Sequence, residues 1–224
     1  MLEITSGMGG VAGTGGLASI GAGAHVVLTG FLTGAALIMA IGAQNAFLLR
    51  QGLRGEHVLP LVLLCAFSDA LLIAVGVAGL GWLVERVPQA LSLARYGGAA
   101  FLFAYGAFAL HRASRGAAMD AGDGPRVSLA TALGTCLVMT YLNPHLYLDT
   151  VVLVGSIANQ YPDHGRWLFG AGAILSSIAW FFSLGYGSRL LRPLFARPIA
   201  WRLLDLLIAV VMFTMAWSLF MPRT

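Results

Sequence analysis

The sequence predicts an all-α integral membrane protein with six transmembrane helices. Three observations support this fold class: 58% of the 224 residues are hydrophobic, only 10% are charged, and the mean hydropathy is +0.84. Soluble domains carry roughly 25% charged residues. Apolar segments separated by short, arginine-bearing connections fill nearly the whole chain, so no region remains for a soluble domain.

Six segments are long enough to cross a membrane, since a spanning helix needs about 20 mainly apolar residues. They are 26–49, 58–84, 90–110, 127–158, 167–188 and 203–221. We expect one membrane domain over 26–224, with halves of three helices each at about 26–111 and 127–221.

Residues 1–25 are expected to form a Gly-rich, weakly ordered tail. The only charged residue in this stretch is Glu3. It has neither the basic start nor the compact apolar core of a signal peptide. Translation from Met8 or a later position is an alternative that the sequence leaves open.

The distribution of arginine predicts the orientation, because cytoplasmic loops carry an excess of basic residues. All 13 basic residues are arginines. One side of the membrane would receive Arg50, Arg54, Arg112, Arg115, Arg126, Arg189, Arg192, Arg197 and Arg202, and the other Arg86, Arg95, Arg166 and Arg223. The loop 111–126 is therefore predicted to be cytoplasmic, with both termini outside.

The fourth segment, 127–158, is predicted to be interrupted. As a straight helix it would be about 48 Å long, whereas the hydrocarbon core is about 30 Å thick. Pro144 removes a backbone donor and clashes with the preceding turn, and Asn143 is biased away from helical dihedrals. Broken backbone at membrane depth is tolerated only where protein or a wet cavity covers it, so Asn143 and Pro144 are predicted to line a cavity.

The first segment contains a matching interruption at Gln44 and Asn45, two adjacent amides that follow Gly42. A shift of 99 positions places Gln44 on Asn143. The two halves would cross the membrane in opposite directions, which predicts a 3+3 inverted repeat with interrupted first and fourth helices. Paired interruptions of this kind indicate a transporter binding site. The alternative is that the amides only form hydrogen bonds between helices.

Asp69 lies near the middle of the second segment. An aspartate at the centre of a membrane helix costs about 2.5–3.5 kcal/mol, and such residues usually serve a function. Asp69 can bind a cation or carry a proton. A hydrogen-bonded structural acid is the alternative.

Polar side chains also follow the predicted break in the fourth segment. Asp149 is either a second acid of the cavity or a helix-end residue at the interface. Tyr147 lies between Asp149 and the break, and His145 either relays protons or bonds the broken backbone. At the cytoplasmic start of the last segment, a local pair with Arg202 is enough to explain Asp205.

Small residues allow membrane helices to approach closely. Gly30 and Gly34 form a GxxxG pair, which indicates either packing within the chain or a homodimer through Gly-rich helix faces. Cys65 and Cys136 lie in apolar segments without metal-ligand spacing, so we expect no metal and no cofactor. Catalytic motifs are missing from the sequence, and no basic cluster with aromatics suggests nucleic-acid binding.

Three stretches resemble the lysine exporter (LysE) family, in particular its lysine and arginine exporter branch. They are GAQNAFLLRQGLR at 42–54, CAFSDALLIAVGVAG at 65–79 and TYLNPHLYLDTVVLVGS at 140–156. The resemblance covers nearly the whole chain from about residue 26. The chain departs from some family patterns at Ala43, where some arginine exporters have proline, and at His145, where homoserine and threonine exporters carry lysine.

The resemblance implies a transporter of a bacterial inner membrane, not an enzyme, that exports basic amino acids and is driven by the electrochemical gradient. The matching positions, which we expect to bind substrate, are Gln44, Asn45, Asp69, Asn143, Pro144, Tyr147 and Asp149. Asp69 is also the expected proton-coupling residue. Three alternatives remain: a transporter of a neutral amino acid or a metal cation, a redox carrier using Cys65 and Cys136, and an intramembrane hydrolase using Asp69 and Asp149.

Overall fold

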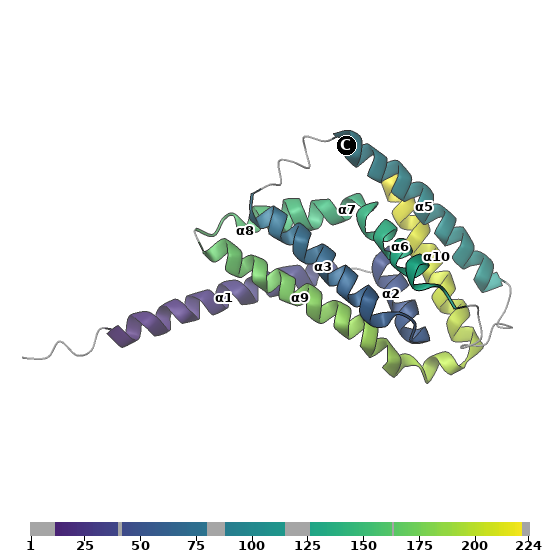
Figure 1. Ribbon diagram of the computed structural model, residues 1–224, viewed down its shortest axis with the longest axis horizontal. Coiled ribbons are helices and arrows are strands. Elements are labelled where there is room, and N and C mark those ends of the chain that lie inside the picture. Colours follow the sequence, from purple (N-terminus) through teal and green to yellow (C-terminus); the bar gives the residue numbers. More distant parts are fainter. Residues whose placement is uncertain (1–11, 40–41, 80–87, 115–125, 163, 221–224) are drawn as a thin grey trace, which may run out of the picture.

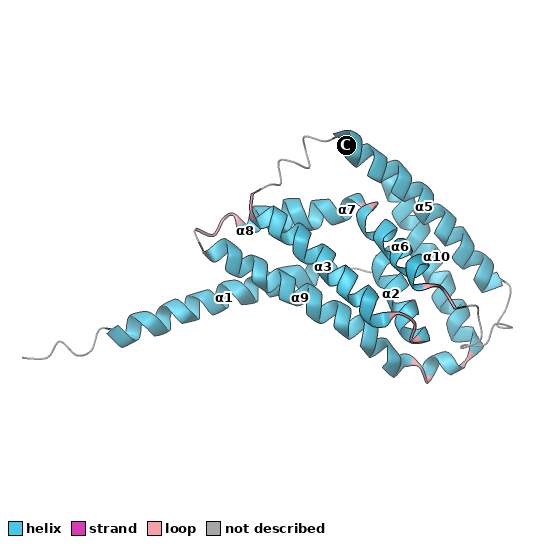
Figure 2. Ribbon diagram, in the orientation of Figure 1, coloured by secondary structure: helices cyan, strands magenta, loops and turns pink. Residues whose placement is uncertain are grey.

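The computed structural model describes residues 12–39, 42–79, 88–114, 126–162 and 164–220. Every regular element in these ranges is a helix (Figure 2). Four helical segments, which include Val58–Val77, are long and apolar enough to cross a membrane, and a bent helix pair makes a fifth. The expected class, an all-helical integral membrane protein, is therefore confirmed.

The described elements follow one another along the chain as shown in Figure 1. They are α1 (Ala12–Ile38), α2 (Ala43–Arg54), α3 (Val58–Val77), α5 (Pro88–Ser114), α6 (Leu129–Tyr141), α7 (Pro144–Tyr147), the π-helical turn η1 (Leu148–Leu153), α8 (Val154–Ala158), α9 (Gly165–Gly187), the 3₁₀ turns η2 (Ser188–Leu191) and η3 (Leu194–Ala196), and α10 (Pro198–Phe220).

The first helix begins earlier than the sequence suggests. Residues 12–25 were expected to belong to the tail, but they form the N-terminal turns of α1. Proline is absent from this stretch and alanine recurs in it, so nothing in the backbone stops the helix from starting before the apolar run. The helix extends beyond the rest of the bundle on one side (Figure 1). The remainder of the expected tail lies outside the described residues.

The fourth segment is broken where the sequence predicts. Helices α6 and α7–α8 meet at an angle of 61°. Pro144 occupies the first position of α7, where its missing N–H removes no hydrogen bond. The side-chain oxygen of Asn143 accepts a hydrogen bond from the His145 N–H at 3.1 Å. Asn143 and Pro144 therefore end one helix and start the next.

The first segment is also interrupted, just before its two amides. Helix α1 ends at Ile38 and α2 begins at Ala43, with Gly42 in an extended conformation before it. Gln44 and Asn45 therefore lie in the first turn of α2, where N–H groups have no partner within the helix.

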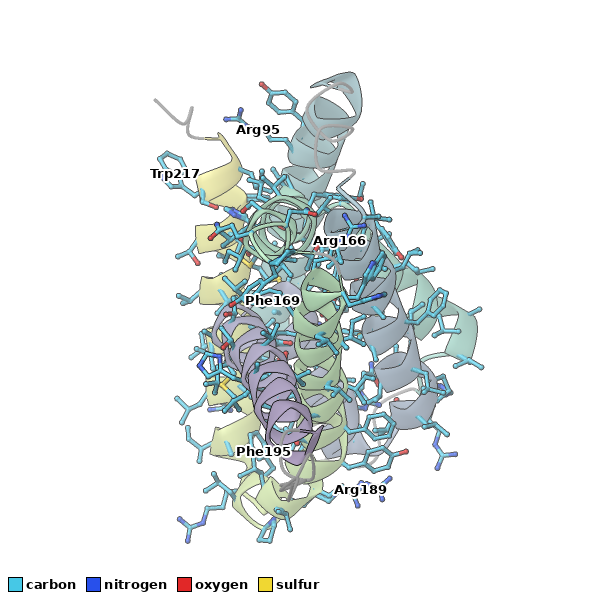
Figure 3. The ribbon with its side chains drawn as sticks, turned by 90° about the vertical axis from the view of Figure 1, so that its left-hand side faces the viewer. Arg95, Arg166, Phe169, Arg189, Phe195 and Trp217 are labelled. Carbon is cyan, nitrogen blue, oxygen red and sulfur yellow. The ribbon has the colours of Figure 1, made fainter. Side chains whose placement is uncertain are left out.

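Close glycine contacts hold the bundle together. A Cβ atom at Gly30 would overlap the Phe169 carbonyl of α9, and one at Gly172 would overlap the Val27 carbonyl of α1. Phe169 lies where these two helices cross (Figure 3). A Cβ atom at Gly76 of α3 would lie 2.6 Å from the Val151 carbonyl. These contacts are all within one chain, so for these glycines the packing interpretation holds.

Helix α5 packs along α10 in a separate pair. At 27 residues α5 is long enough to cross a membrane, but it is not among the apolar spans. Arg95 lies near one end, and His111 and Arg112 lie in its last turn. Polar ends of this kind place a helix's charged groups at the two interfaces.

Candidate functional site

A cavity of about 310 Å³ lies where the two broken segments meet α3, α9 and α10. Five of the seven residues predicted to bind substrate line it: Gln44, Asn45, Asp69, Asn143 and Asp149. They come from α2, α3, the α6–α7 break and η1, so residues far apart in the sequence converge on one space.

The Asn45 side chain makes two hydrogen bonds at the first break. Its side-chain N–H donates to the Ile38 carbonyl at the end of α1 at 2.8 Å, and its side-chain oxygen accepts from the Trp180 indole N–H at 3.3 Å. The neighbouring Gln44 differs, because its buried Nε2 makes no hydrogen bond of normal geometry among the described residues and lies near the Cys65 thiol. Of the two amides, Asn45 supports the backbone, and Gln44 lines the cavity without a strong hydrogen bond of its own.

Asp69 is buried, with 4% of its surface exposed. Its Oδ2 accepts a hydrogen bond of 2.9 Å from the Ser177 hydroxyl of α9. Ser177 was not predicted, although the Ser176-Ser177 pair in the middle of an apolar segment is a signal that the sequence offers. Both serines line the cavity.

Asp149 lines the cavity, which supports its interpretation as a second cavity acid. It lies in the π-helical turn η1 together with Thr150, whose hydroxyl donates to the Leu146 carbonyl at 2.6 Å. Turns of this type occur frequently at functional sites. Thr150 also lines the cavity and was missed from the sequence.

Pro144 and Tyr147 do not line the cavity, in contrast to the prediction. Pro144 is buried at the start of α7. The Tyr147 hydroxyl donates to the Tyr141 carbonyl at 2.8 Å, across the break. Because Tyr147 bonds back to the last turn of α6, its side chain holds the bend rather than facing the cavity. His145, by contrast, lines the cavity.

The charge of the lining favours a cation. Asp69 and Asp149 are its two carboxylates, and no arginine is among the described residues around it. Charges buried at membrane depth are expensive unless they are paired or protonated. A positively charged ligand with hydrogen-bond donors therefore complements this cavity.

Cys65 and Cys136 meet in the packed core between α3 and α6, with 3.4 Å between their sulfur atoms. Both are fully buried, and neither lines the cavity. The proximity that a redox carrier needs is present, but access to the cavity is not.

Asp205 of α10 does not form the expected local pair with Arg202. Its Oδ1 accepts from Arg50 of α2 at 2.5 Å and from Arg112 of α5 at 3.0 Å. A carboxylate of one helix thus joins the ends of two others, which sequence neighbours alone could not reveal.

Comparison with known proteins identifies the family. Residues 35–222 match the family model described as LysE type translocator. The arginine exporter protein ArgO of Yersinia enterocolitica is 43% identical over 87% of this chain and 95% of its own length. The lysine exporter LysE of Corynebacterium diphtheriae is 35% identical over 88% of this chain and 99% of its own.

A candidate amino-acid transporter of Mycobacterium tuberculosis is 48% identical over 80% of this chain and 89% of its own. No solved structure matches the chain. These relatives are transporters and exporters, not enzymes. With its helices broken around one cavity and a family match over most of its length, the chain belongs to the LysE type translocator family.

Proposed function

We propose that this protein is a secondary transporter that exports L-arginine, L-lysine or both from the cytoplasm. The observation that carries the proposal is the cavity, whose lining contains two carboxylates and no arginine among the described residues. The relatives named as an arginine exporter and a lysine exporter support the same substrate class.

The seven predicted residues fall into two groups in this proposal. Asp69 and Asp149 bind the cationic groups of the substrate, and the Gln44 amide donates to its carboxylate. Asn45, Asn143, Pro144 and Tyr147 hold the two helix breaks open, which is supported by their hydrogen bonds and positions at those breaks. Backbone groups freed at such breaks complete the site.

The size of the cavity supports a single amino acid as cargo. At about 310 Å³ it lies at the lower end of small-molecule sites, which range over roughly 300–1,000 Å³. A longer peptide would need more space than this conformation provides.

We infer that the six helices form a 3+3 inverted repeat, with both termini outside and the 111–126 loop in the cytoplasm of a bacterial cell. The pattern of contacts supports the repeat. Helices α1 and α2 pack on α9, just as α6, η1 and α8 pack on α3, and α5 packs on α10. In a 3+3 repeat, α1–α2 corresponds to α6–α8, α3 to α9, and α5 to α10. Replacing every helix by its counterpart leaves the same pairs of helices in contact.

Proton antiport is the coupling that we propose. Moving one positive charge outward against 100 mV costs about 2.3 kcal/mol, and one inbound proton cancels this electrical cost. Asp69 would bind the proton and the substrate cation alternately. An Asp69→Asn variant should lose most of its export, and any export that remains should not depend on the pH gradient. Normal export with normal pH dependence in this variant would contradict the mechanism.

The first test is an export assay in bacteria lacking their own exporters. Cells are loaded with arginine-, lysine- or alanine-containing dipeptides, and release of the free amino acid is followed with and without this protein. Fast release of arginine or lysine, but not alanine, is expected. Release of alanine alone would indicate a neutral amino acid as the substrate, and no release of any of the three would contradict the proposal.

A further inference from the structure

A second charged cluster lies away from the cavity and is not used by the proposed site. It consists of Arg50, Arg112 and Asp205, from α2, α5 and α10. The side chains are only 9% to 17% exposed. Both guanidinium groups share one carboxylate oxygen, Oδ1 of Asp205, at 2.5 Å and 3.0 Å.

The Arg50–Asp205 ion pair joins two helices that also line the cavity. Helix α2 contributes Asn45 and α10 contributes Met215 to the cavity. Arg50 lies about 8 Å further along α2 than Asn45, and Asp205 lies about 15 Å along α10 from Met215. A substrate passing between α2 and α10 from the arginine-rich side must therefore pass this cluster.

The two arginines are not held equally. The Arg112 guanidinium also lies over the Phe108 ring, 4.7 Å from its centroid, and over the Tyr105 ring at 5.7 Å. These cation–π contacts favour its position independently of Asp205. Arg50 is carried by α2, whose first turn borders the cavity, and Asp205 is its one described ion-pair partner.

We propose that Asp205 is a first binding site for the guanidinium or ammonium group of the substrate on the cytoplasmic side, and that Arg50 occupies it when no substrate is bound. An incoming cation exchanges with Arg50 on the same carboxylate. Asp205 stays paired with Arg112 during the exchange. The displaced Arg50 guanidinium turns toward water at the arginine-rich side, because an unpaired buried charge is strongly unfavourable. The inference rests on the proposed function and orientation.

The test uses inside-out membrane vesicles that contain the full-length protein, so that the cytoplasmic face meets labelled arginine. Asp205→Asn should raise the KM about tenfold and leave the maximal rate within twofold. Arg50→Gln removes the competing cation and should lower the KM about threefold. Arg202→Gln, an exposed arginine of the same helix, is the matched control and should leave the KM unchanged.

The decisive result is that the KM rises in Asp205→Asn and falls in Arg50→Gln. An ion pair that only stabilises the fold would instead weaken transport in both variants. Rates are normalised to the amount of protein in the membrane. A higher KM in Arg50→Gln, or an unchanged KM in Asp205→Asn, would overturn the inference while leaving the proposed function intact. Wild-type vesicles that transport neither arginine nor lysine would contradict the proposed function itself.

Discussion

At the scale of single residues, the surroundings of Asp69 determine which ligand charge the cavity favours. The carboxylate is buried and has a single described hydrogen bond, from Ser177. Asp149 reaches the same cavity from a π-helical turn. The cavity therefore presents carboxylates from two separate elements, α3 and η1, to a bound cation.

Ser177 and Ser176 provide a matched pair for testing this arrangement. Ser177→Ala removes the hydrogen bond to Asp69, and bonds to charged groups contribute about 1.5–3 kcal/mol. We expect the KM for arginine to change at least tenfold in a transport assay. Ser176 donates instead to the Ala173 carbonyl of its own helix at 2.7 Å, so Ser176→Ala should change the KM less than twofold. Equal changes of the KM in Ser177→Ala and Ser176→Ala would show that the hydrogen bond from Ser177 to Asp69 does not contribute to substrate binding.

The two buried cysteines allow a second test at this scale. Because neither lines the cavity, the double variant Cys65→Ser and Cys136→Ser should export arginine within twofold of the wild-type rate. Its thermal unfolding temperature in detergent should fall, since burying a hydroxyl in place of a thiol is unfavourable by about 1–3 kcal/mol when it is poorly bonded. Loss of export by properly inserted protein would support the redox alternative.

At the scale of elements, the two breaks shape the cavity. Each break is supported by side chains that bond the freed backbone: Asn45 to the Ile38 carbonyl and Tyr147 to the Tyr141 carbonyl. A third support comes from α5, where Gly98 allows the Leu142 carbonyl to approach closely. The bend between α6 and α7 therefore depends on packing against a neighbouring helix as well as on Pro144.

Adjacent glycines of α5 test that dependence. A Cβ atom at Gly98 would overlap the Leu142 carbonyl, whereas a Cβ atom at Gly97 would meet nothing within 4 Å. Gly98→Ala should lower stability by about 1–3 kcal/mol and slow export. Gly97→Ala should be neutral or stabilising by up to about 1 kcal/mol, because alanine favours helices. Thermal unfolding and initial export rates are measured for both variants. Equal stabilities and equal rates would mean that the close contact between Gly98 and the Leu142 carbonyl does not support the bend.

At the scale of the whole molecule, arginines lie at both ends of the bundle. Figure 3 shows Arg189 at one end and Arg95 at the other. Arg50, Arg112 and Asp205 join α2, α5 and α10 at one position, while the cavity joins the breaks of both halves. Among the described glycines, Gly97 and Gly134 have no neighbour within 4 Å of an added Cβ, so they stay available for the homodimer contact that the sequence suggests.

The proposed orientation predicts labelling from opposite sides of the membrane. Ser114 and Gln160 are both exposed, and the arginine distribution places Ser114 inside and Gln160 outside. In a background with both native cysteines replaced by serine, an impermeant maleimide should label Gln160→Cys in intact cells. Ser114→Cys should react only after permeabilisation. The reverse pattern would invert the orientation.

The sequence by itself determined the membrane class, the break at Asn143-Pro144 and most of the polar residues around the cavity. These features are local: apolar length decides insertion, and proline cannot continue a helix whatever surrounds it. It also pointed to the family, because three polar motifs stand at fixed places in an apolar chain.

Only the tertiary structure decided which side chains face the cavity. Tyr147 and Asp149 are close in sequence, yet Tyr147 bonds back to α6 while Asp149 lines the cavity, because residues two apart on a helix point to different faces. Ser177 reaches Asp69, and Asp205 reaches Arg50 instead of Arg202, through contacts between helices that no local pattern encodes. Rotation and packing of whole helices set these partners, and both arise only when the bundle assembles.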